Sequence, residues 1–334
     1  MTRVRTILVG IYSPFAAWNI PGSYVDRLRE TFPNHDILHA RSEAEALALI
    51  PQAQVAFMSE VRPQHFAAAR ELAWIHSPAA GVGGMLFPAL VESAVQMTNS
   101  RGISADTIAE HVLAVTLALF RKLPLALQSQ SARTWAQDAI LALPPLRMIA
   151  GSEVLVVGFG SIGEATARRM FALGARVTAI RRQPGMPRPD FVERVAGPAD
   201  LLDLLSTAGV VVLAAPHTRE TRRLIGAREL AAMRQDAIVV NVSRGTLIDE
   251  AALTAALETR PAATIGGAAL DVFEDEPLSP ESRLWHLPNV LITPHMAGFR
   301  SDHWDAVTTL FSENLRRFEA GQPLRNVVNK ANGY

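Results

Sequence analysis

The sequence contains no cysteine, and of its 32 basic residues only Lys122 and Lys330 are lysine. Without cysteine the chain can form no disulfide framework, no thiolate nucleophile and no cysteine-ligated metal site. The histidines show no metal-ligand spacing, so we expect no bound metal. The other 30 basic residues are arginine, which indicates a coding bias and raises the background chance of finding an arginine at any position.

Long apolar runs and an excess of one charge are also missing. The longest apolar stretches, Val112–Phe120 and Val210–Pro216, are shorter than the roughly 18–20 residues of a membrane span. The formal net charge is zero and no block of basic residues occurs, so we expect neither a membrane nor a nucleic-acid partner. The run Ile7–Ile11 is too short for a signal peptide, and we expect a cytoplasmic protein.

What is present is the composition of a globular protein: 334 residues, 49% hydrophobic and 19% charged, enough for about two domains. In the first hundred residues short β-like runs alternate with helical patterns, which predicts βαβ units and a mostly parallel sheet. The expected strands are Thr6–Ile11, Asp36–His39, Val55–Met58, Leu72–Ser77 and Val95–Asn99. The expected helices are Gly22–Thr31, Ser42–Leu49 and Pro63–Arg70.

A long helix is expected from Ile103 to near Pro124, because its apolar residues recur every three or four positions. A loosely patterned segment follows this helix. We expect Trp135, Trp285 and Trp304 to be packing residues.

A second β/α alternation begins after the loosely patterned segment. Its expected strands are Glu153–Val157, Arg176–Ile180, Gly209–Ala215, Ala237–Asn241, Thr264–Asp271 and Val290–Thr293. Its expected helices are Ser161–Leu173, Leu201–Leu205, Ala227–Met233, Glu250–Glu258 and Ser301–Phe318.

A glycine-rich loop joins the strand at Val154–Val157 to the next helix. It reads Gly158, Phe159, Gly160, Ser161, Ile162 and Gly163, a G-x-G-x-x-G pattern in the strand–turn–helix context that binds a dinucleotide. Gly158 allows the tight turn, Gly160 lets the backbone approach a pyrophosphate, and Gly163 allows close helix–strand packing. The alternative is an ordinary glycine-rich turn.

The cofactor preference depends on the residues after the next strand, which ends at Ile180. An NAD-binding chain has an acidic residue there for the ribose 2′-hydroxyl, whereas this chain has Arg181 and Arg182. Guanidinium groups bind a 2′-phosphate through charge-assisted hydrogen bonds. We therefore predict NADP, used as NADPH, with NAD as a weaker alternative; the competing interpretation is a solvated loop in an arginine-rich chain.

Together these patterns predict an α/β protein with two doubly wound parallel-sheet domains. The boundary between the two sheets is expected near residue 102. The last 35 residues are too few to form a domain and must pack back onto one of the sheets.

Three expected strand ends carry groups that could perform chemistry. Arg244 follows the first, His295 follows the third, and four acids lie at the end of the second: Asp271, Glu274, Asp275 and Glu276. Ligands of an open α/β sheet bind outside the carboxyl ends of its strands. We therefore expect these groups at the edge of the sheet that holds the dinucleotide.

These segments, in this order, resemble the D-isomer-specific 2-hydroxyacid dehydrogenases, in particular their NADP-dependent glyoxylate/hydroxypyruvate reductases. The resemblance rests on Gly158–Gly163, Arg244-Gly245, Asp271 with Glu276-Pro277, Thr293-Pro294-His295, Ala79–Val82, Ala109-Glu110-His111 and Pro216–Thr221. It implies an oxidoreductase that reduces small 2-keto acids such as glyoxylate or hydroxypyruvate to D-2-hydroxy acids by hydride transfer from NADPH. It also implies a homodimer. In the implied architecture a Rossmann dinucleotide-binding domain, residues 103–298, is inserted into a flavodoxin-like substrate domain, residues 1–102 plus 299–334.

The resemblance assigns catalytic roles to Arg244, Glu276 and His295. A histidine can protonate the carbonyl oxygen near neutral pH, and a carboxylate beside it orients the ring and stabilises its protonated form. An arginine can hold the substrate carboxylate and polarise the carbonyl. Glu274 and Asp275 compete with Glu276 for the acidic role, and the Glu-Pro step of the family favours Glu276.

The remaining implied contacts are with cofactor and substrate. The resemblance places Asp271 at the nicotinamide amide and the backbone N–H groups of Ala80, Gly81 and Val82 at the substrate carboxylate. It places Pro216, His217 and Val242 beside the cofactor. Two alternatives stay open: the same fold with phosphite as hydride donor, and a non-catalytic NAD(P)-sensing protein of the corepressor kind.

Overall fold

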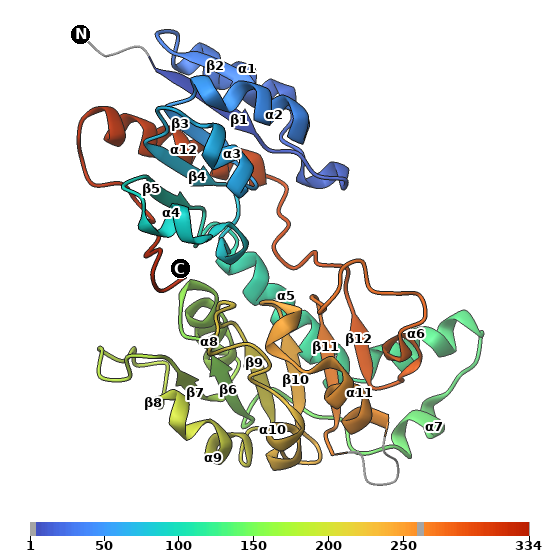
Figure 1. Ribbon diagram of the computed structural model, residues 1–334. Helices are drawn as coiled ribbons and strands as arrows, with labels where there is room; N and C mark the ends of the chain where they lie inside the picture. The colour runs from blue at the N-terminus through green and yellow to red at the C-terminus, as the bar shows by residue number, and fades with distance from the viewer. Residues whose placement is uncertain (1–4, 259–263, 334) are drawn as a thin grey trace. The chain divides into compact units, whose positions relative to one another are not determined.

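The computed structural model describes residues 5–258 and 264–333. The chain divides into two compact units (Figure 1), of which one is formed by Met1–Ile103 with Arg300–Tyr334 and the other by Ser104–Phe299. The expected domain ranges also include residues 1–4, 259–263 and 334, which lie outside the described residues. We call the two units the five-stranded and the seven-stranded unit, after their sheets.

The five-stranded unit has the parallel strand order β2-β1-β3-β4-β5, which is the flavodoxin-like order. Its strands are β1 (Thr6–Gly10), β2 (Asp36–His39), β3 (Val55–Met58), β4 (Trp74–Ser77) and β5 (Gln96–Asn99). Its helices are α1 (Gly22–Thr31), α2 (Glu43–Leu49), α3 (Pro63–Ala68), α4 (Pro88–Glu92) and α12 (His303–Glu319). The C-terminal helix α12 thus belongs to the sheet formed by the first hundred residues.

Alternate residues of these strands face opposite layers of helices, as the two-residue period of a strand requires. One face packs against α1 and α12, where Phe311 stacks between Phe57 and Trp74 with ring centroids 4.3 and 5.3 Å away. The other face, which includes Leu8 and Met58, packs against α2 and α4. Helices on both faces bury the central strand β3 completely, which explains its continuous apolar sequence, whereas the edge strands β2 and β5 each begin with an exposed polar residue.

The seven-stranded unit has the order β12-β11-β10-β9-β6-β7-β8, again with every pair parallel. Its strands are β6 (Glu153–Val157), β7 (Arg176–Ile180), β8 (Arg194–Ala196), β9 (Val210–Leu213), β10 (Ile238–Asn241), β11 (Gly267–Leu270) and β12 (Val290–Ile292). Its helices are α5 (Ala105–Phe120), α6 (Leu123–Ser131), α7 (Gln137–Leu141), α8 (Ser161–Ala172), α9 (Leu201–Leu205), α10 (Ala227–Ala232) and α11 (Glu250–Glu258). The strand order reverses between β6 and β9, and a Rossmann sheet binds its dinucleotide at that point.

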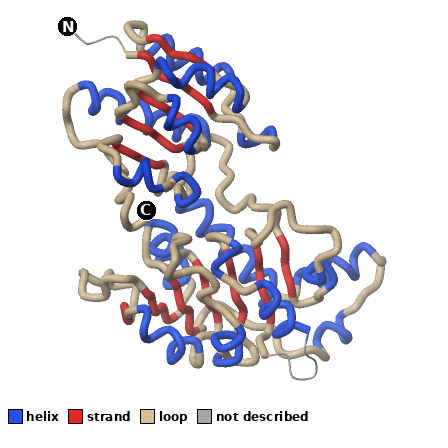
Figure 2. Tube along the Cα trace, viewed as in Figure 1, coloured by secondary structure: helices blue, strands red, loops and turns tan. Residues whose placement is uncertain are grey.

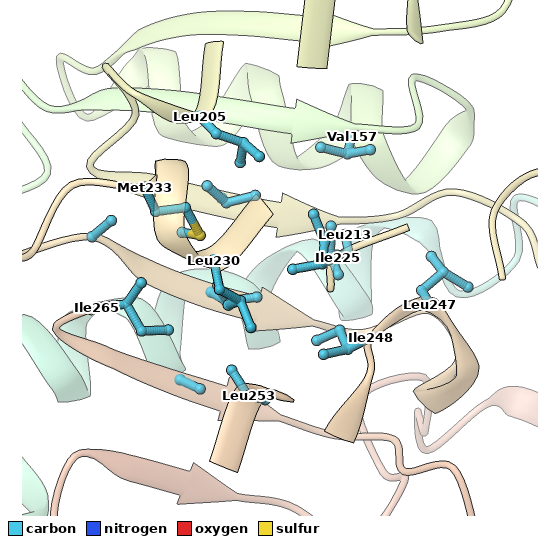
Figure 3. Close-up of a cluster of buried hydrophobic side chains, with 14 of the residues drawn as sticks. Val157, Leu205, Leu213, Ile225, Leu230, Met233, Leu247, Ile248, Leu253 and Ile265 are labelled. Carbon is cyan, nitrogen blue, oxygen red and sulfur yellow. The ribbon is translucent and has the colours of Figure 1, made fainter. Parts of the chain in front are cut away.

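Two apolar layers sandwich this sheet, and helices flank it on both sides in Figure 2. Figure 3 shows one layer, in which Leu205 of α9, Leu230 of α10 and Leu253 of α11 meet strand residues such as Val157 and Leu213. The opposite layer is formed by α5 and α8. The predicted fold class is confirmed, and most predicted elements agree with the structure to within a few residues.

One predicted region is wrong. The long helix ends at Phe120 rather than near Pro124, and Pro124 instead lies in the first turn of a separate helix, α6. Proline is tolerated there because the first N–H groups of a helix have no partner within it. The segment predicted to be loosely patterned contains α6 and α7. The short elements α4 and β8 were not predicted either.

The exposed side chains between residues 123 and 148 explain this error. Trp135, predicted to pack, is 88% exposed, and Trp285 is also exposed. Leu127 and Leu141 are exposed as well, so α6 and α7 lack the buried stripe from which helices are predicted.

Within the described part of the chain no single helix is long and apolar enough to span a membrane. Helices α5 and α6 together reach that length and composition, but the pair is bent by 69°.

Candidate active site

The glycine loop lies at the carboxyl end of β6, where the strand order reverses. Gly158 has φ +99°, a left-handed conformation that favours glycine, and a Cβ there would overlap the backbone of Ala214 and Ala215. A Cβ on Gly163 would overlap the carbonyl oxygen of Gly158, whereas one on Gly160 would meet nothing within 4 Å. The first and third glycines are therefore needed for packing, and the second leaves open space beside the start of α8.

The two arginines after β7 lie in different surroundings. The Arg181 guanidinium donates hydrogen bonds to the carbonyl oxygens of Met186 and Pro187, the latter at 3.1 Å, and thereby holds the following loop. Arg182 is exposed. The pKa of Glu220 lies below its usual value, mainly through a hydrogen bond with Thr218, with further contributions from Arg182 and Arg219. Arg182 therefore faces the loop that follows β9.

The loop after β9 contains the next predicted cofactor residues. His217 Nδ1 lies 2.6 Å from Thr246 Oγ1, which joins this loop to the segment after β10. The carbonyl oxygen of Pro216 accepts a hydrogen bond from Thr221 at 2.6 Å. Val242 is buried in the apolar layer against α5 and α8, so its side chain is a packing residue at the edge of the site.

His295 and Glu276 form a close pair at the ends of β12 and β11. His295 Nδ1 lies 2.6 Å from Glu276 Oε2, and Oε1 of the same carboxylate accepts the Phe273 N–H at 3.0 Å. Burial opposes ionisation of Glu276, but the hydrogen bonds from His295 and Phe273 and the nearby charges of His295 and Arg244 outweigh it, so the pKa of this carboxyl is lowered. Glu276 is thus an ionised acceptor that orients the imidazole.

Arg244 lies beside this pair, after β10. Burial lowers the pKa of its guanidinium and Glu276 partly compensates, so an arginine remains charged in a largely desolvated position. Its Nη1 donates to the Ser243 carbonyl at 2.6 Å. A Cβ on the adjacent Gly245 would overlap the backbone of Phe273, so this glycine lets the strand ends that carry Arg244 and Glu276 approach each other.

The two competing acids lie elsewhere. Glu274 pairs with Arg223 at 3.4 Å, and Asp275 is exposed. Of the three neighbouring acids in this turn, Glu276 is the one whose carboxylate contacts the histidine.

Asp271, predicted to contact the nicotinamide amide, holds the turn that carries His295. It is 3% exposed; Oδ1 accepts from Thr293 Oγ1 at 2.6 Å and from Met296 N at 2.9 Å, and Oδ2 accepts from Ala297 N at 3.0 Å. Each carboxylate oxygen can accept two hydrogen bonds, so Oδ2 retains capacity for an amide donor. Thr293 Oγ1 also contacts Nε2 of His111 in α5, a residue for which the sequence predicts no role.

The predicted substrate loop belongs to the five-stranded unit and follows β4. The Ala79 carbonyl accepts from Ser100 N at 3.1 Å and the Ala80 carbonyl from Asn99 Nδ2 at 2.6 Å. Because a trans peptide points its N–H opposite its C=O, the N–H groups of Ala80 and Gly81 point away from these partners. Val82 is buried, and the glycines after it lie in a 3₁₀ turn, Gly83–Met85.

These features fit a dinucleotide. The open position at Gly160, the uncompensated N–H groups at the start of α8 and the basic residues after β7 are the elements that would hold its pyrophosphate and ribose. Next to them, the seven-stranded unit brings together Arg244, Glu276, His295 and Asp271 at the carboxyl ends of neighbouring strands. Ala80, Gly81 and Val82 belong to the five-stranded unit.

Comparison with known proteins agrees with the predicted resemblance. The model of the family described as "D-isomer specific 2-hydroxyacid dehydrogenase, NAD binding domain" matches residues 113–297. A glyoxylate reductase of Thermococcus gammatolerans is 30% identical over 328 residues, with 93% of this chain and 94% of the relative covered. A D-3-phosphoglycerate dehydrogenase of Synechocystis sp. is 34% identical over 88% of this chain, which spans only 52% of that relative's length.

Solved structures give the same result. A D-isomer specific 2-hydroxyacid dehydrogenase from Xanthobacter autotrophicus Py2, in complex with NADPH and MES, has a TM-score of 0.80 at 30% identity, covering 99% of this chain and 100% of that one. An NADPH-dependent glyoxylate/hydroxypyruvate reductase from Sinorhizobium meliloti, in complex with NADP and sulfate, has a TM-score of 0.80 at 26% identity, with the same coverage of both chains.

Proposed function

The chain belongs to the D-isomer-specific 2-hydroxyacid dehydrogenase family, and on that premise we propose that it reduces small 2-keto acids to D-2-hydroxy acids with NADPH. Glyoxylate and hydroxypyruvate are the proposed substrates. The observation that carries the proposal is the 2.6 Å pair of His295 and Glu276 beside Arg244. Full-length similarity to a glyoxylate reductase supports the choice of small acids.

Reduction of a keto acid requires a proton at the carbonyl oxygen, and His295 is the proposed donor. Its Nδ1 is bonded to Glu276, so the proton to be delivered is on Nε2 at the opposite side of the ring. The ionised Glu276 stabilises the imidazolium before transfer and fixes its orientation. Such general acid catalysis typically contributes about 10²–10⁴-fold to the rate.

Arg244 is proposed to bind the substrate carboxylate. A guanidinium can form two parallel hydrogen bonds with a carboxylate, and the partly desolvated position of Arg244 strengthens them. The same charge polarises the adjacent carbonyl as negative charge develops on its oxygen. A bound nicotinamide dinucleotide supplies the hydride that completes the reduction.

The NADPH preference is supported by Arg182 and by the relatives. Arg182 is exposed after β7, and Arg219 contributes a second positive charge near Glu220. Arg181 is engaged with the carbonyl groups of its own loop, so we assign the 2′-phosphate contact to Arg182 and a supporting role to Arg181. The two similar structures described above are complexes with NADPH and NADP.

The experiment is a parallel assay of absorbance at 340 nm with NADPH and NADH. Glyoxylate, hydroxypyruvate, pyruvate and a bulky aryl keto acid are offered in turn, with phosphite tested in the oxidative direction. Turnover of the small acids with NADPH is expected. Tight NADPH binding without turnover of any acid would refute the proposal and favour phosphite or a cofactor-sensing protein.

A matched pair of variants tests the acidic role. Glu276→Gln removes the charge that contacts His295, and we expect a fall in kcat of about 10²-fold. Asp275→Asn removes the same charge from the neighbouring exposed position, and we expect it to be neutral. Equal effects of the two variants would contradict the assignment of Glu276.

We also propose a homodimer formed by residues 123–148 of the seven-stranded unit. The exposed side chains Leu123, Leu127, Trp135, Leu141, Leu143 and Met148 place an unusual amount of apolar surface in this one segment. Sedimentation of wild type and of a Leu127→Asp/Trp135→Asp variant tests this: we expect a dimer and a monomer, respectively. A wild type that is monomeric at micromolar concentration would refute it.

A further inference from the structure

A chain of polar contacts leads from the middle of α5 to the turn that carries the proposed proton donor. His111 Nε2 lies 3.2 Å from Thr293 Oγ1, and Thr293 Oγ1 lies 2.6 Å from Asp271 Oδ1. Asp271 then accepts the N–H groups of Met296 and Ala297, the two residues that follow His295. These contacts join residues 182 positions apart in the sequence.

The direction of each hydrogen bond follows from the groups present. The Asp271 carboxylate accepts from two backbone N–H groups, so the Thr293 hydroxyl directs its proton toward Oδ1. The remaining lone pairs of Thr293 Oγ1 can then accept a proton from Nε2 of His111. Burial lowers the pKa of His111, against the effect of Asp271, so a neutral ring that carries its proton on Nε2 satisfies the whole chain.

The turn held by this chain is strained. His295 has φ +49°, in the left-handed region that non-glycine residues rarely occupy. Its own N–H bonds to the Asp271 carbonyl at 2.8 Å and lies 3.0 Å from the Thr293 carbonyl. A strained backbone at a functional site persists only where its surroundings over-determine it. Here Asp271 holds the strained turn, because its carboxylate accepts the N–H groups of Met296 and Ala297 and its carbonyl accepts that of His295.

Helix α5 supports the same turn at a second point. The position of a Cβ on Gly298 lies 3.6 Å from Ser104 Cβ and 3.7 Å from Ile108 Cδ1. His111, one turn further along α5, reaches the opposite end of the turn at Thr293. The helix therefore lies along residues 293–298 and contacts them at both ends.

We propose that His111 and Thr293 are positioning residues for His295, acting through Asp271 to hold its imidazole against Glu276. The inference rests on the proposed function, in which His295 is the proton donor. Neither residue contacts the reacting atoms. Their role is to keep the Asp271 carboxylate oriented so that it fixes both sides of the turn.

The central test compares Thr293→Val with Thr293→Ser. Valine keeps the shape of threonine and removes the hydroxyl, so Asp271 loses one donor and His111 loses its acceptor. We expect kcat to fall about tenfold to hundredfold, the effect of one lost hydrogen bond to a charged group, with an unchanged KM for the keto acid, which Arg244 is proposed to bind. Serine retains the hydroxyl and should restore kcat to within about threefold of wild type. His111→Phe should lower kcat by about threefold to tenfold, because it breaks a neutral hydrogen bond.

Thr116→Val is the matched control on the same helix. The Thr116 hydroxyl is buried and has no hydrogen-bond partner among the described residues, so its removal should leave kcat unchanged. A fall in kcat in this variant equal to that in Thr293→Val would show that the effect is general loosening of α5, and would overturn the proposal.

A spectroscopic readout separates this inference from the proposed function. The proton between His295 Nδ1 and Glu276 should give a downfield NMR signal, assigned by its loss in His295→Gln. Thr293→Val should broaden or shift this signal and Thr116→Val should not. If wild type turns over no keto acid, the proposed function fails while this signal still decides the positioning role. An unchanged signal together with an unchanged kcat in Thr293→Val would overturn it.

Discussion

His76 of β4 provides a prediction that can be worked quantitatively. Its side chain is fully buried; Nδ1 lies 2.7 Å from Thr98 Oγ1, and the ring is surrounded by Phe57, Trp74 and Phe311 with centroids 5.3–6.0 Å away. Burial lowers the pKa of this imidazole from 6.5 to about 3. The folded protein therefore keeps His76 neutral at acidic pH values at which the unfolded chain protonates it.

The sign and size of the effect follow from linkage. Below pH 6.5 the unfolded state binds a proton that the native state excludes, so stability falls as the pH falls toward about 3. Between pH 7 and pH 5 the contribution of His76 to the free energy of unfolding decreases by about 2 kcal/mol. Replacement with asparagine, whose amide can reach Thr98 in place of Nδ1, removes this dependence.

The assay is urea unfolding of wild type and His76→Asn at both pH values, followed by tryptophan fluorescence. Trp74 reports on this core because its ring centroid lies 6.0 Å from that of His76. The change in unfolding free energy between the two pH values is taken for each protein, which cancels the constant cost of the substitution. The difference between the two changes then cancels the titration of the other histidines. Wild type should lose about 2 kcal/mol more than the variant. Equal losses would refute the argument.

Three further outcomes are expected. His295→Gln should lower kcat about 10²–10⁴-fold with an unchanged Kd for NADPH; retained turnover would exclude it as the proton donor. Arg182→Ser should raise the KM for NADPH about tenfold to hundredfold and leave the KM for NADH unchanged. Arg181→Ser should raise the KM for both cofactors. A KM for NADPH that does not respond to Arg182→Ser would contradict the assignment of the 2′-phosphate contact to Arg182. Phe311→Ala should lower the free energy of unfolding by about 3–5 kcal/mol in urea, and a change below 1 kcal/mol would contradict the packing described for α12.

The sequence predicts the fold well where burial is strong. The sequence predicts the bounds of β2, β3, β6 and β7 residue for residue. In β3, β6 and β7 the signal is a mostly buried apolar run bounded by turns, whereas β2 has one buried residue, Ile37. Helices α6 and α7 were missed for the opposite reason: Leu127 and Trp135 face away from the core, so no buried periodicity exists to detect.

Some residues of the site can also be predicted from the sequence and others cannot. The glycine loop and Arg181-Arg182 are predicted because each is a short local pattern next to a predicted strand. The choice of Glu276 over Glu274 or Asp275 comes from the Glu-Pro step of the family resemblance. Spacing alone leaves it open, because in such a turn the direction of each side chain depends on local backbone geometry. The link between His111 and Thr293 had no sequence signal, since it joins the middle of a helix to a strand end 182 positions away.

The place of α12 has a consequence for synthesis of the chain. The strands of the five-stranded unit are translated before Val307, Phe311 and Leu315, which fill one face of their sheet. The seven-stranded unit lies between them in sequence, and as a compact unit it ends at Phe299. We therefore expect the order of folding to be the reverse of the order of emergence, with the five-stranded sheet exposing one apolar face until α12 has been translated. During that interval it is the part of the nascent chain that most needs a chaperone.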